Sequence, residues 1–117
     1  MKDKLIYTYY GDVMILICNK KEIELKMCKT FFSRFKGFML CNDIDKALLF
    51  DRCNSIHTFF MLKNIDVIMC DKNNVVMYYY KNLDKNKVIW PKKGVYKTYE
   101  TPAMYFDVKI NDKLEVK

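Results

Sequence analysis

The segment Ser55–Asp71, SIHTFFMLKNIDVIMCD, most constrains the fold of this chain because it contains an apolar run with a single acid inside it. Alternation along this run puts Ile65, Val67 and Met69 on one face of a strand and Asp66, Ile68 and Cys70 on the other. Both faces are largely apolar. The run is therefore predicted to form a central strand that is covered on two sides.

Asp66 is the unusual residue of this strand. A carboxylate in such surroundings must be hydrogen-bonded, ion-paired or open to solvent, since its desolvation otherwise costs several kcal/mol. His57, the only histidine, lies in a stretch that is rich in residues favoured in strands. We therefore expect its imidazole on a strand or at the mouth of one, and both residues are candidate site residues.

The composition indicates one folded domain that spans residues 1–117. Hydrophobic residues make up 51% of the chain and charged residues 30%, which excludes wholesale disorder. Eight Phe and nine Tyr residues against three glycines and two prolines favour many half-buried strands. The predicted class is α+β, predominantly antiparallel β, with one or two short helices.

The chain shows no apolar run of the length that spans a bilayer and no signal-type start, so a cytoplasmic protein is expected. Its five cysteines are odd in number and lack a Cys-x-x-Cys pair, which favours reduced thiols. A metal site built from Cys53, His57 and distant ligands, or thiol catalysis by Cys53 with His57, stays open as an alternative. Neither a metal nor a cofactor is predicted.

A net charge of +7 is concentrated in Lys81–Lys97, which holds six lysines and one acid. A solvated loop is one interpretation, and affinity for anionic partners is the other. Trp90 and Tyr78–Tyr80 would allow stacking on single-stranded nucleic acid. Only Arg34 and Arg52 are arginines, which weakens base reading, and we do not expect strong nucleic-acid binding.

The element pattern begins with an antiparallel meander, in which only Glu22–Cys28 alternates cleanly between apolar and charged residues. Strands are predicted at Lys4–Tyr10, Val13–Cys18, Glu22–Cys28, Ala47–Phe50, Val75–Tyr80, Val95–Glu100 and Lys113–Val116. Residues 81–94 are expected to be irregular.

Two short helices are predicted. The first begins after the cap Thr30 and ends at Gly37, with Phe31, Phe35 and Phe38 as a core stripe. Thr101-Pro102 is typical of a helix start and predicts one helical turn at Ala103–Phe106.

The order of several short motifs resembles the bacterial and archaeal family called domain of unknown function 192. The matching pieces are Arg34-x-x-Gly37-Phe38-Met39, Leu48-Leu49-Phe50, Cys53-x-x-Ile56-His57-Thr58-Phe59-x-Met61, Ile65-Asp66-Val67 with Asp71, Trp90, Tyr99-Glu100-x-Pro102-Ala103 and Asn111-Asp112. They cover about residues 28–117. The resemblance implies a compact, β-dominated, barrel-like domain with short helices, and it implies no established activity.

This chain departs from the family at positions where glycine is usual, around 101–104, at Asp107 and at Asn111. Asparagine and aspartate adopt left-handed conformations at modest cost, so the turns are expected to survive. A close backbone approach to a ligand at these positions is less expected.

Our leading hypothesis is a non-enzymatic binding or accessory domain that holds a small ligand or peptide near Arg34, His57, Met61 and Asp66. One alternative is a hydrolase-type enzyme in which His57 and Asp66 act as base and orienter, with Cys53 as a possible nucleophile. Another is a purely structural role, in which the imidazole bonds to backbone and Asp66 caps a loop or pairs with Arg34. No catalytic residue is assigned.

Overall fold

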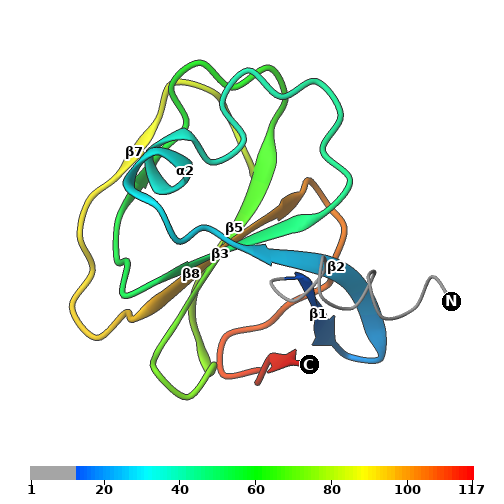
Figure 1. Cartoon of the computed structure of the whole chain (residues 1–117). Helices are drawn as coiled ribbons and strands as arrows, with labels where there is room; N and C mark the ends of the chain where they lie inside the picture. Colours follow the sequence, from blue (N-terminus) through cyan, green and yellow to red (C-terminus); the bar gives the residue numbers. More distant parts are fainter. Residues whose placement is uncertain (1–12) are drawn as a thin grey trace, which may run out of the picture.

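Seven of the nine strands among the described residues form one mixed sheet that curls into half of a barrel (Figure 1). The computed structural model describes residues 13–117, so the predicted strand Lys4–Tyr10 lies outside the described residues. The strand order is β6 (Val76–Leu83), β5 (Ile65–Cys70), β8 (Lys97–Pro102), β3 (Ala47–Asp51), β2 (Lys21–Met27), β1 (Val13–Cys18) and β9 (Glu115–Val116). A small second sheet pairs β4 (Ile56–His57) with β7 (Val88–Ile89), and α2 (Phe31–Lys36) is short.

Neighbouring strands of the large sheet are antiparallel with one exception. The prediction of a predominantly antiparallel fold is therefore correct for most pairs and wrong for β2 and β3, which run parallel with Leu25 opposite Ala47. The chain leaves β2, forms α2 and crosses residues 37–46 before it enters β3. A connection of this length is what a parallel pair requires.

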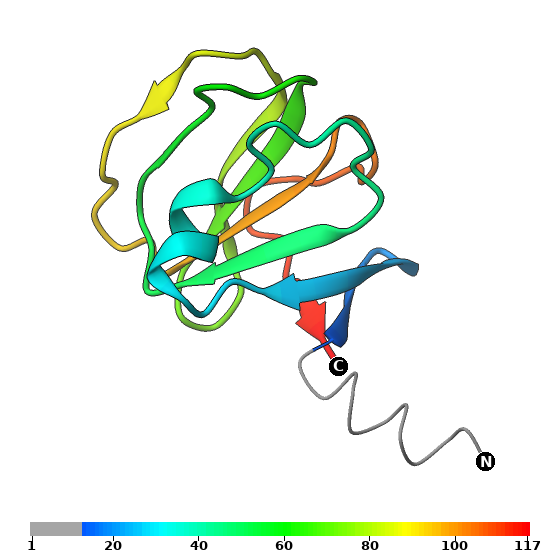
Figure 2. The same ribbon diagram turned by 45° about the horizontal axis from the view of Figure 1, so that its top comes forward.

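β5 is the central strand that the sequence predicted. It lies between β6 and β8, and each of its six residues is buried. Ile68 and Cys70 face the inside of the curl, where they pack with Leu16, Tyr99 and Leu114. Val67, Met69 and Ile65 face the other side, toward a second core that includes Phe38, Phe50 and Met61. Figures 1 and 2 show α2 and β7 over this second side.

The two ends of the curled sheet are joined by the segment before β9. Val75 forms a bridge with Lys113, and the Leu114 N–H donates to the Asn74 carbonyl at 2.9 Å. β9 itself pairs with β1, and Figure 2 shows the two strands together. Of the positions where the resemblance led us to expect glycine, Asn111 has φ 78° and Met104 has φ 64°, so left-handed turns are kept there, whereas Asp107 is not left-handed.

The predicted helix at Ala103–Phe106 is wrong. Thr101 and Pro102 belong to β8, where they pair with Asp66 and Ile65 of β5. Because the Thr101 backbone is paired with β5, Thr101 does not cap a helix. Only a turn follows β8, in which the Tyr105 N–H donates to the Pro102 carbonyl at 3.2 Å.

Residues 81–94 are more regular than expected. β6 continues to Leu83, and β7 follows at Val88–Ile89.

The first helix forms as predicted, from Phe31 to Lys36. Thr30 and Ser33 make a reciprocal capping box, and Gly37 ends the helix with φ 50°. Phe38 is buried, but Phe35 is 54% exposed, so the expected core stripe is wrong at that position. Within residues 13–117, no helix has the length and apolar character needed to cross a membrane.

Candidate functional site

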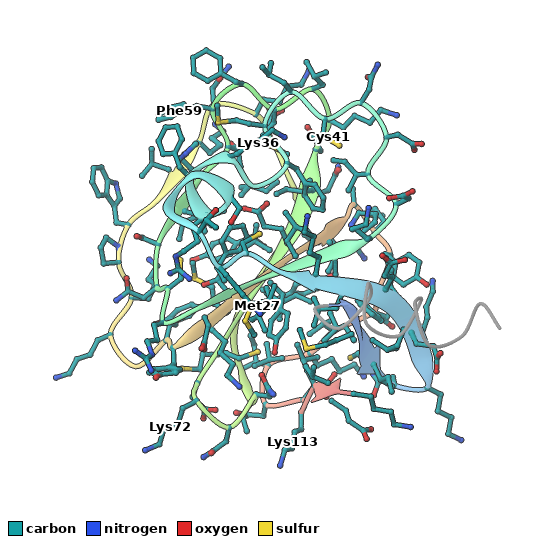
Figure 3. All side chains as sticks on the ribbon, viewed as in Figure 1. Met27, Lys36, Cys41, Phe59, Lys72 and Lys113 are labelled. Carbon is teal, nitrogen blue, oxygen red and sulfur yellow. The ribbon has the colours of Figure 1, made fainter. Side chains whose placement is uncertain are left out.

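A cavity of about 280 Å³ lies between α2 and the sheet. α2 and the residues after it form one wall with Arg34 and Phe38, the segment of residues 53–61 forms another with His57 and Met61, and Glu100 of β8 contributes from the sheet. The lining is largely apolar with few charged groups, which is the usual composition of a ligand pocket. In Figure 3, Lys36 and Phe59 mark this end of the molecule, opposite Lys72 and Lys113.

His57 lies on β4, at the pocket wall. Its Nδ1 accepts the N–H of Phe59 at 3.2 Å, so in the neutral imidazole the proton belongs on Nε2. The ring stacks on Phe59 with centroids 5.2 Å apart and meets Phe35 at 5.3 Å. The expectation that His57 sits on a strand is confirmed, and so is its bond to backbone.

Arg34 and Met61 also line the cavity, as the leading hypothesis expected. Arg34 is half-buried on α2, and its Nη2 lies 3.4 Å from the Arg52 carbonyl, which is a weak bond. Met61 is buried and packs with the second core. Three of the four candidates therefore share one cavity.

Asp66 does not join them, because its side chain points to the opposite face of β5. Its Oδ1 accepts the Asn82 N–H at 2.7 Å, and its Oδ2 lies 2.9 Å from the Tyr79 hydroxyl. The register between β5 and β6 shifts at this point: Ile65 opposes Leu83 while Val67 opposes Tyr80. The carboxylate therefore takes up a backbone N–H that the irregular pairing would otherwise leave without a partner.

This arrangement bears on the catalytic and the structural alternatives for His57 and Asp66. The suggested pairing of Arg34 with Asp66 is not formed, and His57 and Asp66 are not joined as base and orienter. The Cys53 thiol donates to the Ser55 carbonyl at 3.1 Å. Among the residues that the structure describes, no three His, Cys, Asp or Glu side chains are grouped to hold a metal ion.

The buried cysteines are poor nucleophiles. Burial raises the pKa of the Cys28 thiol to about 11 and that of Cys70 to about 12, with Glu100 and Asp71 respectively adding repulsion. A thiol with such a pKa is almost wholly protonated at neutral pH.

Glu100 is the site residue that sequence reasoning missed. It lies on β8 opposite Leu48 of β3 and Val67 of β5, and it is 4% exposed. Burial raises the pKa of its carboxyl to about 8, against the lowering effect of a hydrogen bond from the Phe38 backbone. Its Oε1 has no hydrogen-bond partner within residues 13–117. Its strand reads KTYETP and is not apolar, so the available signal was only its place in the motif Tyr99-Glu100-x-Pro102-Ala103.

Thr58 explains why the basic segment is ordered. Its Oγ1 accepts the Lys87 N–H at 2.7 Å and donates to the Asp84 carbonyl at 2.9 Å, and the side chain is buried. These hydrogen bonds hold residues 84–87 in place immediately before β7. Trp90 follows β7 and is 72% exposed, and the expectation that nucleic acid is not bound strongly stays a prediction.

Comparisons with known proteins agree on family and fold. The sequence profile of the domain of unknown function 192 family, described as an uncharacterized ACR, matches residues 14–116. A UPF0127 protein of Thermococcus sibiricus is 37% identical over 101 residues, which cover 79% of this chain and 65% of the relative. This chain spans 54 to 65% of the length of three Thermococcus relatives.

Two solved structures have the same fold. A protein of unknown function from Novosphingobium aromaticivorans superposes with a TM-score of 0.73 at 14% identity, covering 88% of this chain and 83% of its own. A protein from Sinorhizobium meliloti, described as a candidate transcription regulator, superposes with a TM-score of 0.75 at 16% identity, covering 89% and 92%. At these identities the likeness concerns the fold alone.

Proposed function

We propose that this chain, which belongs to the domain of unknown function 192 family, is a non-enzymatic binding domain that holds a small ligand or a peptide side chain in the pocket between α2 and the sheet. The observation that carries the proposal is a largely apolar cavity of about 280 Å³ whose lining includes a buried carboxyl with one oxygen that has no partner among residues 13–117. Specific pockets are commonly built in this way, with few polar groups on apolar walls.

The size of the cavity limits the ligand. A volume of about 280 Å³ lies at the lower end of the range for ligand pockets, so the proposed ligand is small or is a single side chain of a peptide. His57, Arg34 and Met61 would contact it from two walls.

Binding rather than catalysis is favoured by the partners of the polar groups. The His57 Nδ1 and the Cys53 thiol are both engaged with backbone groups, and Asp66 lies on the other face of the sheet. A cytoplasmic setting is part of the proposal, and the five free cysteines support it because thiols persist in reducing compartments.

Protein-observed NMR with a library of small apolar fragments tests the function. We expect chemical-shift changes at the amides of residues 34–39, 53–57 and 61, and loss of these changes in Met61→Trp, which fills the cavity. Met104→Trp adds the same indole at an exposed position and should bind as the native chain does. Shift changes confined to residues 88–91, or none with any fragment, would contradict the proposal.

A further inference from the structure

We propose that Glu100 is the recognition group of this pocket and that it selects ligands that carry a primary ammonium group on a small apolar body. The inference rests on the proposed binding function and names the chemical class of the ligand.

The Glu100 carboxyl lies against the backbone that follows α2. The Phe38 backbone supplies one hydrogen bond to it, while Oε1 has no partner among residues 13–117. Glycine at position 37 lets the carboxyl pack closely against the backbone, because a Cβ there would lie 3.1 Å from Oε1, closer than an ordinary contact. Glu100 therefore contributes to the cavity wall a buried carboxyl with one oxygen that has no partner among residues 13–117.

A buried acceptor without a partner favours a ligand that donates a hydrogen bond to it. A buried polar atom without a hydrogen bond costs free energy, which a donor from the ligand would recover. In the free protein the raised pKa of about 8 keeps the carboxyl mostly protonated at pH 7. An ammonium group would favour its ionised form and displace that proton, since opposite charges attract strongly where water is excluded.

The walls suit a cation with an apolar body. Phe35, Phe38 and Phe50 line the cavity, and the faces of phenylalanine rings attract cations. The ionisable groups that line it with Glu100 are Arg34 and Lys36 from α2, and Cys53 and His57 from the facing wall; Cys28 also interacts with the carboxyl. Arg34 is half-buried and Lys36 is exposed, so water screens much of their repulsion toward an ammonium group bound at Glu100.

Titration of the native chain with benzylamine and benzyl alcohol between pH 5.5 and 8, followed by NMR, tests the inference. Benzylamine affinity should rise about tenfold per pH unit up to pH 7 and about fivefold more by pH 8, since binding requires loss of one proton from a group with a pKa of about 8. Benzyl alcohol should show no such rise, and at pH 8 benzylamine should bind at least about tenfold more tightly.

Two variants locate the titrating group. Glu100→Gln keeps the side-chain shape and should remove the pH dependence and the preference for the amine, while alcohol binding persists. Histidines also change charge in this pH range, so His57→Gln is the control and should retain the slope. Loss of the slope in His57→Gln would assign it to the imidazole and overturn the inference.

The outcomes separate the inference from the function. If both probes shift the pocket amides of the native chain equally at every pH, selection by Glu100 is wrong while the binding function stands. If neither probe nor any fragment shifts those amides, the proposed function itself fails. Both readings use the native chain and do not depend on the folding of a variant.

Discussion

Two buried carboxyl groups on neighbouring strands differ in their hydrogen bonding. Asp66 accepts hydrogen bonds at both oxygens on the inner face of the curl, whereas Glu100 keeps an oxygen without a partner on the outer face, among the described residues. A satisfied carboxylate supports the fold, and an unsatisfied one weakens it until something binds. Asp66 and Glu100 lie on adjacent strands. Because successive side chains of a strand point to opposite faces, their positions along the strands decide which of the two cores each side chain enters.

Glu100 should make the stability of the native chain depend on pH. Its pKa of about 8 in the folded chain exceeds the ordinary value of 4.5. As pH rises between these values the unfolded chain releases the proton first, so the free energy of unfolding should fall, on the order of a few kcal/mol in total, and level off above pH 8.

Urea denaturation at several pH values measures this effect. Glu100→Gln should lose the decline between pH 5 and 8 and become relatively more stable at the upper end. Glu24→Gln makes the same change at an exposed position of β2 and should keep it. Parallel profiles for Glu100→Gln and the native chain would refute the assignment.

Removing the Asp66 carboxylate should destabilise the chain without affecting the pocket. Asp66→Ala leaves the Asn82 N–H and the Tyr79 hydroxyl without this acceptor, so a loss of roughly 3 kcal/mol is expected, against about 1 kcal/mol for Tyr79→Phe. Asp45→Ala, at an exposed residue, should change stability by less than about 0.5 kcal/mol. Unchanged stability of Asp66→Ala, or loss of fragment binding while it remains folded, would contradict this role.

At the scale of elements, the strands with regular apolar patterns were predictable and the irregular ones were not. β2 follows period-two alternation and β5 is an apolar run with one acid, and the structure confirms both as strands. β6 runs past Tyr80 into the polar pair Lys81 and Asn82, because Asp66 accommodates an irregular pairing there that no local pattern announces. The end of β8 was misread because a capping signal and a paired strand share the sequence Thr-Pro.

The candidate site was predictable in part for a related reason. His57, Arg34 and Met61 were identified from a linked set of motifs, and they meet in one cavity. Asp66 is a single acid in an apolar strand, whereas the strand of Glu100 reads KTYETP, so no local pattern marks Glu100. Which of them faces the cavity depends on which face of the sheet α2 covers, and that is a tertiary property.

Thr58 should control the order of the segment between β6 and β7. Thr58→Val removes the acceptor of the Lys87 N–H and the donor to the Asp84 carbonyl. Hydrogen exchange at the amides of Asn86 and Lys87 should accelerate about tenfold or more, since the free energy of local opening should fall by roughly 1.4 kcal/mol or more. Thr58→Ser keeps the hydroxyl and should retain most of the protection. Equal exchange in all three chains would show that the loop is held by other bonds.

At the scale of the whole molecule, the sheet serves different purposes on its two faces. The inner face of the curl is a core closed by the segment before β9, which joins β1 to the start of β6. The outer face is covered by α2 and by residues 53–61, and between them the pocket remains. A closed inner core gives the rigid support that a binding site requires, since site groups placed on strands are held more precisely than those on loops.

Removal of residues 113–117 should therefore cost more than the loss of any one side chain in them. Leu114→Ala creates a cavity at a residue that is 1% exposed and should cost about 2–4 kcal/mol. The deletion also removes the Val75 bridge and the pairing of β1 with β9, including reciprocal bonds between Ile15 and Lys117 at 2.9 and 3.0 Å. Because small domains have only about 5–15 kcal/mol of stability, the truncated chain should lack a cooperative thermal transition, as circular dichroism would show. Glu115→Ala retains the backbone pairing at an exposed position and should melt as the native chain does. If the truncated chain unfolds cooperatively with the same thermal midpoint as Leu114→Ala, closure of the sheet adds no stability beyond that of the Leu114 side chain.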